Sequence, residues 1–328
     1  MAGIESTAFV NQASEIAASL ADGDVSRSEI EADIQTLVDD FDAVLLAEDD
    51  PAGRTVARGD SLSILIGTND GSTLRGRLNS DVIIGGAGED TLNGGRSADG
   101  LFGGDANDEL DGNGGDDLID GGDGDDLIIG GKGNDELRGN EGNDEILGGR
   151  GEDIIVGGSQ GDDISGGSGD DELLGGNGQD RISGNVGNDR VIGGSANDRL
   201  FGRDGADSFV FDPSNNREGD DVIRDFEISI EFEEVILIEA TDTIEISAFD
   251  IEAATDDIAS IDGNPELTAA DLDESPAWSL GASDDGDTLI THPGGTIELA
   301  GVAFDEGLTF QDLQDGGALV ITGNILIG

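Results

Sequence analysis

Aspartates recur every nine residues through the middle of this 328-residue chain, and these side chains could do the most chemistry. The period runs from Gly67 to Val210, which is 144 residues, or 16 units of nine, without an insertion. The sixth position of the unit is Asp in 15 of the 16 units, and the exception is Ser72. The 15 candidate ligands are Asp81, Asp90, Asp99, Asp108, Asp117, Asp126, Asp135, Asp144, Asp153, Asp162, Asp171, Asp180, Asp189, Asp198 and Asp207.

Carboxylates at a fixed period can line up to bind a metal ion. If two units form one coil, the sixth-position Asp of one coil lies about 4.8 Å from that of the next coil. Two carboxylates that close repel by roughly 1 kcal/mol in water and by more inside a protein, so a cation is expected between them. Carboxylate and carbonyl oxygens without His or Cys favour a hard cation, and a flexible loop suits calcium better than magnesium. Sixteen units leave 16 − 2 = 14 gaps between coils, so up to about 14 calcium ions and calcium-coupled folding are expected.

The other positions of the unit predict the element that holds these aspartates. The first position is Gly in all 16 units, and glycines at the first, second and fourth positions are expected to supply the positive φ angles of a tight turn. The last three positions are expected to form a very short strand. Its middle residue, the eighth of the unit, is Leu, Ile, Val or Phe in every unit and is expected to point inward.

The unit resembles the signature GGxGxDxUx of the repeats-in-toxin (RTX, haemolysin-type calcium-binding nonapeptide repeat) family. Examples are GGDGDDLII at 121–129 and GGKGNDELR at 130–138. The resemblance implies a right-handed parallel β-roll with calcium held by the turns of units i and i+2. It also implies export by a type I secretion machinery that reads an uncleaved C-terminal signal, and hence a secreted, extracellular or cell-surface location.

The composition restricts the possible partners and sites but leaves the compartment open. Asp and Glu total 75 against 15 Lys and Arg, and the resulting formal charge of −60 argues against nucleic acid and anionic membranes as partners. Cysteine is absent, which excludes disulfides and thiolate metal sites. The N-terminal sequence has neither a basic region nor an unbroken apolar core, so no cleavable signal peptide is expected, and no transmembrane segment is predicted.

We divide the chain into an N-terminal helical region (1–57), a calcium-binding β-roll (58–210) and a C-terminal β-rich cap with a type I secretion signal (211–328). The overall class is therefore all-β, a parallel β-roll (solenoid) with two flanks. The segment 58–66 is expected to be a capping unit, because it keeps the apolar Leu65 but has Ser63 in the Asp column. In the cap, 205–213, 219–227 and 264–302 resemble the region that follows the repeats in exported family members. The segments LTFQDL (308–313) and GNILIG (323–328) resemble a type I signal.

Residues 4–50 are expected to form two helices. The second has an apolar stripe at Ile30, Ile34, Leu37, Phe41 and Val44 after a capping box of Ser26 and Glu29. This pair could close the open end of the roll, or it could act as a docking or oligomerising helix. An EF-hand remnant at 22–29 is a third interpretation, but Ala18 and Leu20 stand where its first ligands should be.

The outward-facing seventh and ninth positions differ between the two faces of the predicted roll. One face has nine apolar residues in sixteen places, which predicts a surface covered by a flank of this chain or by a neighbouring molecule. These are Val82, Ile84, Phe102, Leu118, Ile154, Val156, Leu174, Ile192 and Val210. The opposite face has only Leu127, Ile129, Leu147 and Phe201.

No catalytic constellation is found in the sequence. The single histidine, His292, lies between the strand-like runs TLIT and TIEL and is expected to be a turn residue. HExxH and nucleotide-binding loops are absent, so an enzyme is not expected. We expect a structural or adhesive calcium-binding protein that self-associates at the cell surface or in the extracellular matrix. Alternatives are a secreted effector acting on host cells or membranes and a passive calcium buffer.

Overall fold

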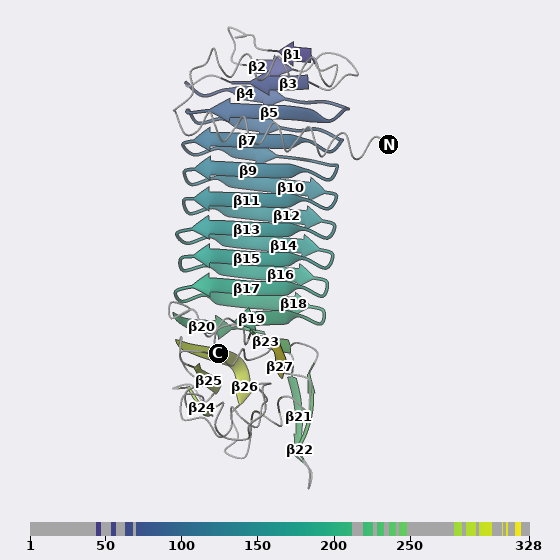
Figure 1. Ribbon diagram of the computed structural model, residues 1–328. Helices are drawn as coiled ribbons and strands as arrows, with labels where there is room; N and C mark the ends of the chain where they lie inside the picture. The colour runs from purple at the N-terminus through teal and green to yellow at the C-terminus, as the bar shows by residue number, and fades with distance from the viewer. Residues whose placement is uncertain are drawn as a thin grey trace, which may run out of the picture. The chain divides into compact units, whose positions relative to one another are not determined.

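The structure is a computed structural model, and its chain divides into two compact units, Met1–Gly167 and Ser168–Gly328, each of which is described by itself. The described residues are 44–46, 54–56, 63–67, 70–211, 219–225, 228–232, 236–240, 243–247, 279–283, 287–292, 295–303, 310, 313 and 319–322. Two sheets recur in both units. We call them sheet A, to which the odd-numbered repeat strands belong, and sheet B, to which the even-numbered repeat strands belong (Figure 1).

The first unit is a stack of parallel strands that alternate between the two sheets. Sheet A contains, in order, β1 (Val44–Leu46), β3 (Ser63–Ile66), β5 (Asp81–Gly86), β7 (Gly100–Asp105), β9 (Leu118–Asp123), β11 (Glu136–Glu141) and β13 (Ile154–Ser159). Sheet B contains β2 (Arg54–Val56), β4 (Thr73–Arg75), β6 (Thr91–Asn93), β8 (Glu109–Asp111), β10 (Leu127–Lys132), β12 (Glu145–Arg150) and β14 (Asp163–Ser168).

The pairing register confirms the predicted coil of two nonapeptides. Ile119 in β9 pairs with Leu137 in β11, and Ile128 in β10 pairs with Ile146 in β12, an offset of 18 residues in both cases. Consecutive nonapeptides therefore lie in opposite sheets, and every second nonapeptide stacks in parallel. This is the all-β parallel solenoid, or β-roll, that the period predicts.

The strands are longer than the predicted three residues. From β9 to β18 each strand has six residues, namely the last three positions of one unit and the first three of the next. In β10, both Ile128 and Gly130 are buried, so the eighth position and the first position point inward. The first-position glycine faces the interior and has no side chain to accommodate there, so the strand can continue through it into the next nonapeptide.

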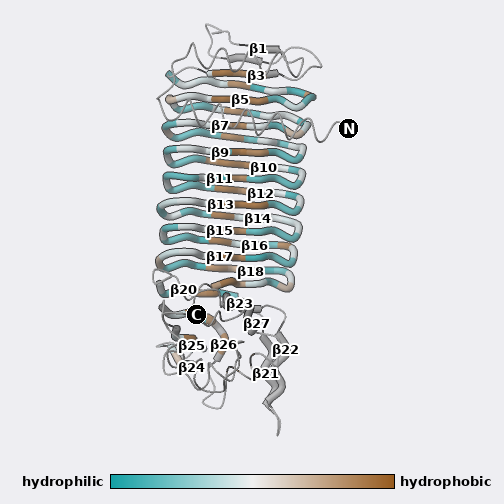
Figure 2. Tube along the Cα trace, in the orientation of Figure 1, coloured by the Kyte–Doolittle hydropathy of each residue, from teal (hydrophilic) through white to brown (hydrophobic). Residues whose placement is uncertain are grey.

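Two apolar side chains, one from each sheet, fill the interior of each coil. All 16 eighth-position residues are at most 2% exposed. They are Leu74, Ile83, Leu92, Leu101, Leu110, Ile119, Ile128, Leu137, Ile146, Ile155, Ile164, Leu173, Ile182, Val191, Leu200 and Phe209. Figure 2 shows the result as apolar strand centres between hydrophilic turns.

The second unit continues the two-sheet pattern beyond the nonapeptides. Its sheet A contains β15 (Glu172–Asn177), β17 (Arg190–Ser195), β19 (Ser208–Phe211), β23 (Thr243–Ser247) and β27 (Leu319–Thr322). Its sheet B contains β16 (Arg181–Val186), β18 (Arg199–Asp204), β20 (Gly219–Ile223), β26 (Gly295–Ala303), β25 (Asp287–His292) and β24 (Ser279–Ala282). A separate antiparallel hairpin joins β21 (Ile228–Phe232) and β22 (Ile236–Ala240).

The C-terminal flank is β-rich in its described residues, as predicted. Strands β24, β25 and β26 pair antiparallel, so the parallel sheet B ends in a meander. His292 ends β25 and pairs with Gly295 at the start of β26, which places it beside the predicted turn. Phe310 and Leu313 of the LTFQDL segment are 1% exposed, whereas 323–328 lie outside the described residues.

The N-terminal boundary of the roll differs from the prediction. Strands β1 and β2 lie within the expected helical region 1–57, and Val44, the last residue of the predicted helical stripe, pairs with Ser63 of β3. Val44, Leu45 and Leu46 extend sheet A, so tertiary pairing overrides the helical periodicity there. The rest of the predicted helical stripe, the capping box and the EF-hand interpretation fall on residues 1–43, outside the described residues.

The predicted apolar outer face lies on sheet A, and its residues differ in exposure. Val82, Ile84 and Phe102 are only 1%, 5% and 6% exposed although they occupy outward positions. The prediction of a covered surface is therefore confirmed for these three. The others are half-buried, except Ile154, which is 48% exposed.

Candidate metal centre

All 15 predicted aspartates lie at the point where a turn enters a strand, and all are between 1% and 4% exposed. In the first unit one column contains Asp81, Asp99, Asp117, Asp135 and Asp153, and the other contains Asp90, Asp108, Asp126, Asp144 and Asp162. The second unit has Asp171, Asp189 and Asp207 in one column and Asp180 and Asp198 in the other. The structure therefore brings them together in the predicted columns.

One oxygen of most of these carboxylates accepts a backbone hydrogen bond from the neighbouring coil. The backbone N–H of Asp108 donates to Oδ1 of Asp126 at 2.7 Å, and the N–H of Asp126 donates to Oδ1 of Asp144 at 2.9 Å. The same bond joins Asp99 to Asp117 at 2.8 Å in the other column. These bonds fix the rotamers of the carboxylates and stack them coil upon coil.

The second oxygen, Oδ2, is buried and accepts no hydrogen bond within the described part of the chain at Asp90, Asp99, Asp108, Asp117, Asp126, Asp135, Asp144, Asp189 and Asp198. A buried carboxylate oxygen without a donor is costly, so each of these atoms requires a positive partner.

The first-position glycine forms the wall of the space beside Oδ2. A Cβ at Gly103 would lie 2.3 Å from Oδ2 of Asp108 and 2.4 Å from the carbonyl oxygen of Gly121 in the next coil. A carboxylate oxygen and a peptide oxygen therefore meet where any other residue would place carbon. The donor set is the one that calcium prefers.

Burial also opposes the charged form of these carboxylates. The pKa values of Asp99 and Asp108 are raised to about 8; burial is the largest cause, the backbone N–H bond lowers the pKa, and the neighbouring carboxylates of the column add to the rise. The pKa values of Asp117, Asp126 and Asp135 rise to about 7 for the same first reason. A cation within the columns would offset this cost, because a positive charge favours the ionised form.

Most of the ligands at each centre must come from the backbone. Within the described residues no three or more His, Cys, Asp or Glu side chains form a group that could hold a metal ion. A pair of stacked carboxylates would therefore be completed by carbonyl oxygens of the turns. The arrangement argues against a transition-metal site of the His and Cys type.

The turn glycines differ from the prediction at one position. Second-position Gly122 and fourth-position Gly124 have φ angles of 110° and 132°, as expected. The first-position glycines do not have positive φ; they are required by the close approach of Oδ2 instead. Among the described residues, seven non-glycine residues have a positive φ, and all occupy the second or fourth position: Ala106, Asn113, Asn140, Gln160, Asn185, Ala196 and Arg203.

Comparison with known families agrees with this geometry. Residues 66–216 match the model of the RTX calcium-binding nonapeptide repeat in seven overlapping segments, beginning with 66–101 and 102–137 and ending with 183–216. The repeat array belongs to the RTX calcium-binding family. No curated protein matches this chain.

RTX repeats are calcium-binding, and the columns above are where this chain would hold the ions. The carboxylates of units i and i+2 and the turn carbonyls beside them are the available ligands. Calcium there would neutralise the columns and join one coil to the next. RTX repeats are typical of secreted proteins, which supports an extracellular location. The described part of the chain contains no helix with the length and hydropathy of a membrane span.

A further RTX-type unit follows the array and was missed in the sequence. Asp221 is 1% exposed, and its Oδ1 accepts the N–H of Asp198 at 2.8 Å across 23 residues rather than 18. Its Oδ2 accepts no hydrogen bond within the described chain, and burial raises its pKa to about 7. Ile223 fills the eighth position and pairs with Leu200. The signal was the spacing G-x-D-x-U in GDDVI, hidden by a five-residue offset.

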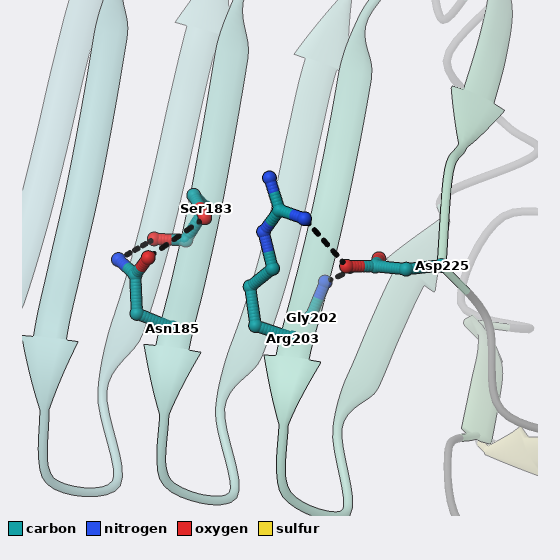
Figure 3. Close-up of polar contacts among 5 residues, drawn as sticks. All are labelled: Ser183, Asn185, Gly202, Arg203 and Asp225. Atoms are coloured by element: carbon teal, nitrogen blue, oxygen red, sulfur yellow. Dashed lines mark hydrogen bonds and ion pairs between the residues drawn. The ribbon is translucent and has the colours of Figure 1, made fainter.

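Asp225 follows this unit and stands where the next first-position glycine would be, 23 residues after Gly202. Its Oδ1 accepts the N–H of Gly202 at 3.0 Å, and its Oδ2 lies 3.6 Å from the Arg203 guanidinium (Figure 3). An arginine therefore provides at this position the positive charge that a cation would provide inside the columns.

A second ladder of side chains at the fifth position was also missed. Oδ1 of Asn107 accepts the N–H of Asp125 at 3.0 Å, and Oδ1 of Asp125 accepts the N–H of Asn143 at 2.8 Å. These residues are exposed, so the ladder lies on the outside of the turn and the sixth-position column lies on its inside. Asn and Asp recur at the fifth position in the sequence, which was the available signal.

Proposed function

We propose that this chain is a secreted, non-enzymatic calcium-binding protein whose roll folds outside the cell and serves as a structural or adhesive component of a cell surface or extracellular matrix. The observation that supports it most directly is the pair of buried carboxylate columns, in which Oδ2 atoms such as those of Asp126 and Asp135 have no hydrogen-bond donor. A fold with this interior depends on a cation supplied by its surroundings.

Calcium-dependent folding would make the chain behave differently inside and outside the cell. Extracellular calcium modules bind in the range of roughly 0.1 to 1 mM, far above cytosolic calcium. The chain would therefore stay unfolded before export and fold after it. Export through a type I machinery is part of the proposal, and it rests on the resemblance of the C-terminal segments to such signals.

A structural or adhesive role is favoured by the outer surfaces. Ile154 is 48% exposed, and Leu118, Val156, Leu174 and Ile192 are half-buried on sheet A, so apolar surface is available for contact with another molecule. The buried polar groups that stand out in the described residues are the repeat aspartates, which the metal columns already explain. We therefore assign no catalysis.

Size-exclusion chromatography and negative-stain electron microscopy, with and without millimolar calcium, test this proposal. We expect a disordered chain in chelator and ordered assemblies larger than a monomer in calcium, with magnesium as the matched control that does not replace it. A calcium-folded chain that stays monomeric at every concentration would contradict the structural role. Calcium-dependent leakage of liposomes would point to an effector acting on membranes instead.

A further inference from the structure

Strand β12 in the first unit presents an outward row of mixed charge on sheet B. Glu145 and Arg150 are exposed at its two ends, Leu147 is half-buried between them, and Gly149 leaves a gap beside Arg150. Among the described residues, Glu145 and Arg150 have no ion-pair partner. We call Glu145, Leu147, Gly149 and Arg150 patch one.

Strand β18 in the second unit presents the complementary row at the same four positions of the repeat. Arg199 and Asp204 are exposed at the ends, Phe201 is half-buried, and Arg203 stands where patch one has a glycine. Within the described chain Arg199 and Asp204 have no ion-pair partner. We call Arg199, Phe201, Arg203 and Asp204 patch two.

The aromatic residue of patch two is held in place by arginines. The guanidinium carbons of Arg181 and Arg203 lie 4.8 Å and 4.6 Å from the centre of the Phe201 ring. Arg203 is also fixed by its contact with Asp225 at 3.6 Å (Figure 3). Patch two is therefore an ordered surface with a net positive charge, in a chain that has 15 basic residues against 75 acidic ones.

We propose that patch one of one copy of this chain docks face to face on patch two of a second copy. Turning one copy by half a turn about a line parallel to its strands preserves the strand direction, so equal repeat positions meet. Glu145 then faces Arg199, Leu147 faces Phe201, Gly149 faces Arg203, and Arg150 faces Asp204. Two ion pairs, one apolar contact and one side chain over a glycine result at four consecutive outward positions.

The contact is small and is expected to be weak. Two six-residue strands cover roughly 20 Å by 10 Å, well below the area of about 800 Å² per partner in stable complexes. Association is therefore expected only at high local protein concentration, as in a surface layer. The contact deepens the proposed assembly function by naming its surface, and it can fail while calcium-dependent assembly by another surface persists.

Two charge-reversal variants test the contact in excess calcium. The first is Arg199→Glu, and the second is Glu145→Arg. The matched control reverses one arginine on the outer side of sheet A, Arg138→Glu. Sedimentation velocity over roughly 1 μM to 1 mM protein measures association, and circular dichroism in calcium confirms folding. The neutral pair Arg199→Gln and Glu145→Gln, in separate chains, serves if a reversal variant fails to fold.

Each reversal variant alone should associate at least tenfold more weakly than the wild type, and an equimolar mixture of the two should recover wild-type association. The recovery is decisive, because a reversed patch of either sign finds its opposite only on the other variant. The control should remain within about twofold of the wild type. Reversal variants that associate like the wild type, or a mixture without recovery, would overturn the proposed contact while leaving the assembly function standing. A wild type that is monomeric throughout would overturn both.

Discussion

The inside of each coil and its turns differ in what they need to be stable. Ile128 and Ile146 are fully buried among apolar neighbours and need nothing beyond the chain itself. Asp126 and Asp144 are as well buried, but burial raises their pKa values to about 7 and about 6, and each has one oxygen without a donor. The comparison teaches that the buried apolar residues define the coil, whereas the carboxylate columns make its folding depend on calcium.

The largest effect is expected from the variant Asp126→Asn, Asp135→Asn and Asp144→Asn. Asparagine keeps an oxygen for the backbone N–H but removes the charge that calcium requires. The calcium concentration for half-maximal folding, followed by circular dichroism, should rise at least tenfold. The control Asp105→Asn, Asp123→Asn and Glu141→Gln removes the same charge from exposed third positions and should change it less than twofold. If both variants required the same calcium concentration for half-maximal folding, the columns would not be the calcium sites.

A substitution in the apolar column should act differently. Ile146→Ala removes a fully buried side chain and should lower the free energy of unfolding in saturating calcium by about 2 to 4 kcal/mol. The number of ions bound should not change, because no ligand is touched. Thermal unfolding and calcium titration measure the two quantities, with the 48% exposed Ile154→Ala as a control that costs less than about 1 kcal/mol. A loss of bound calcium in Ile146→Ala would mean that column and turns are not separable.

Protons should partly replace calcium in the turns. The pKa values of Asp99 and Asp108 are about 8 in the fold against 3.8 for an ordinary Asp, so the folded chain holds more protons than the unfolded one. The stability from these groups is therefore present below pH 4 and is lost as the pH rises to about 8.

In chelator, β structure measured by circular dichroism should increase as the pH is lowered from 8 to 5, above the isoelectric point of about 4.1. In calcium the binding affinity should fall over the same range, since protons compete for the carboxylates. A chelated chain that gains β structure on raising the pH would show that the columns are not the titrating groups.

The smallest effect is expected at turn positions where a residue other than glycine has a positive φ angle. Ala106 and Ala196 have φ angles of 74° and 86° at the fourth position, where most units have glycine. Replacing either by Gly should raise the free energy of unfolding in calcium by up to about 1 kcal/mol, because the left-handed conformation strains a Cβ. Ala98→Gly, at a fifth position without positive φ, should instead be destabilising. Denaturant unfolding distinguishes the two signs.

The fold and most of the site were predictable because a single unit of nine repeats without interruption. The eighth-position column, the 18-residue register and the 15 aspartates all follow from that frame. The strand length did not follow, because the role of the first-position glycine depends on the approach of Oδ2, which exists only after the coils stack. The fifth-position ladder is likewise a contact between coils that no single unit contains.

The sequence-based prediction failed where the nine-residue spacing is interrupted or ends. Asp221 lies 23 residues after Asp198, and its unit has Asn216 and Arg217 in place of two glycines, so counting in nines passes over it. Val44 was assigned to a helix because its spacing fits one, but the edge of sheet A offers it a strand partner in Ser63. In both cases the sheet extends by backbone pairing, which tolerates sequence that the repeat pattern excludes.

Far-ultraviolet circular dichroism of the full chain in excess chelator, followed by addition of calcium at pH 7.5, tests the central claim most directly. We predict a largely disordered spectrum in chelator and a cooperative gain of β structure in millimolar calcium that equal magnesium does not produce. A spectrum already rich in β structure in chelator, unchanged by calcium, would contradict a roll whose buried carboxylates require the metal.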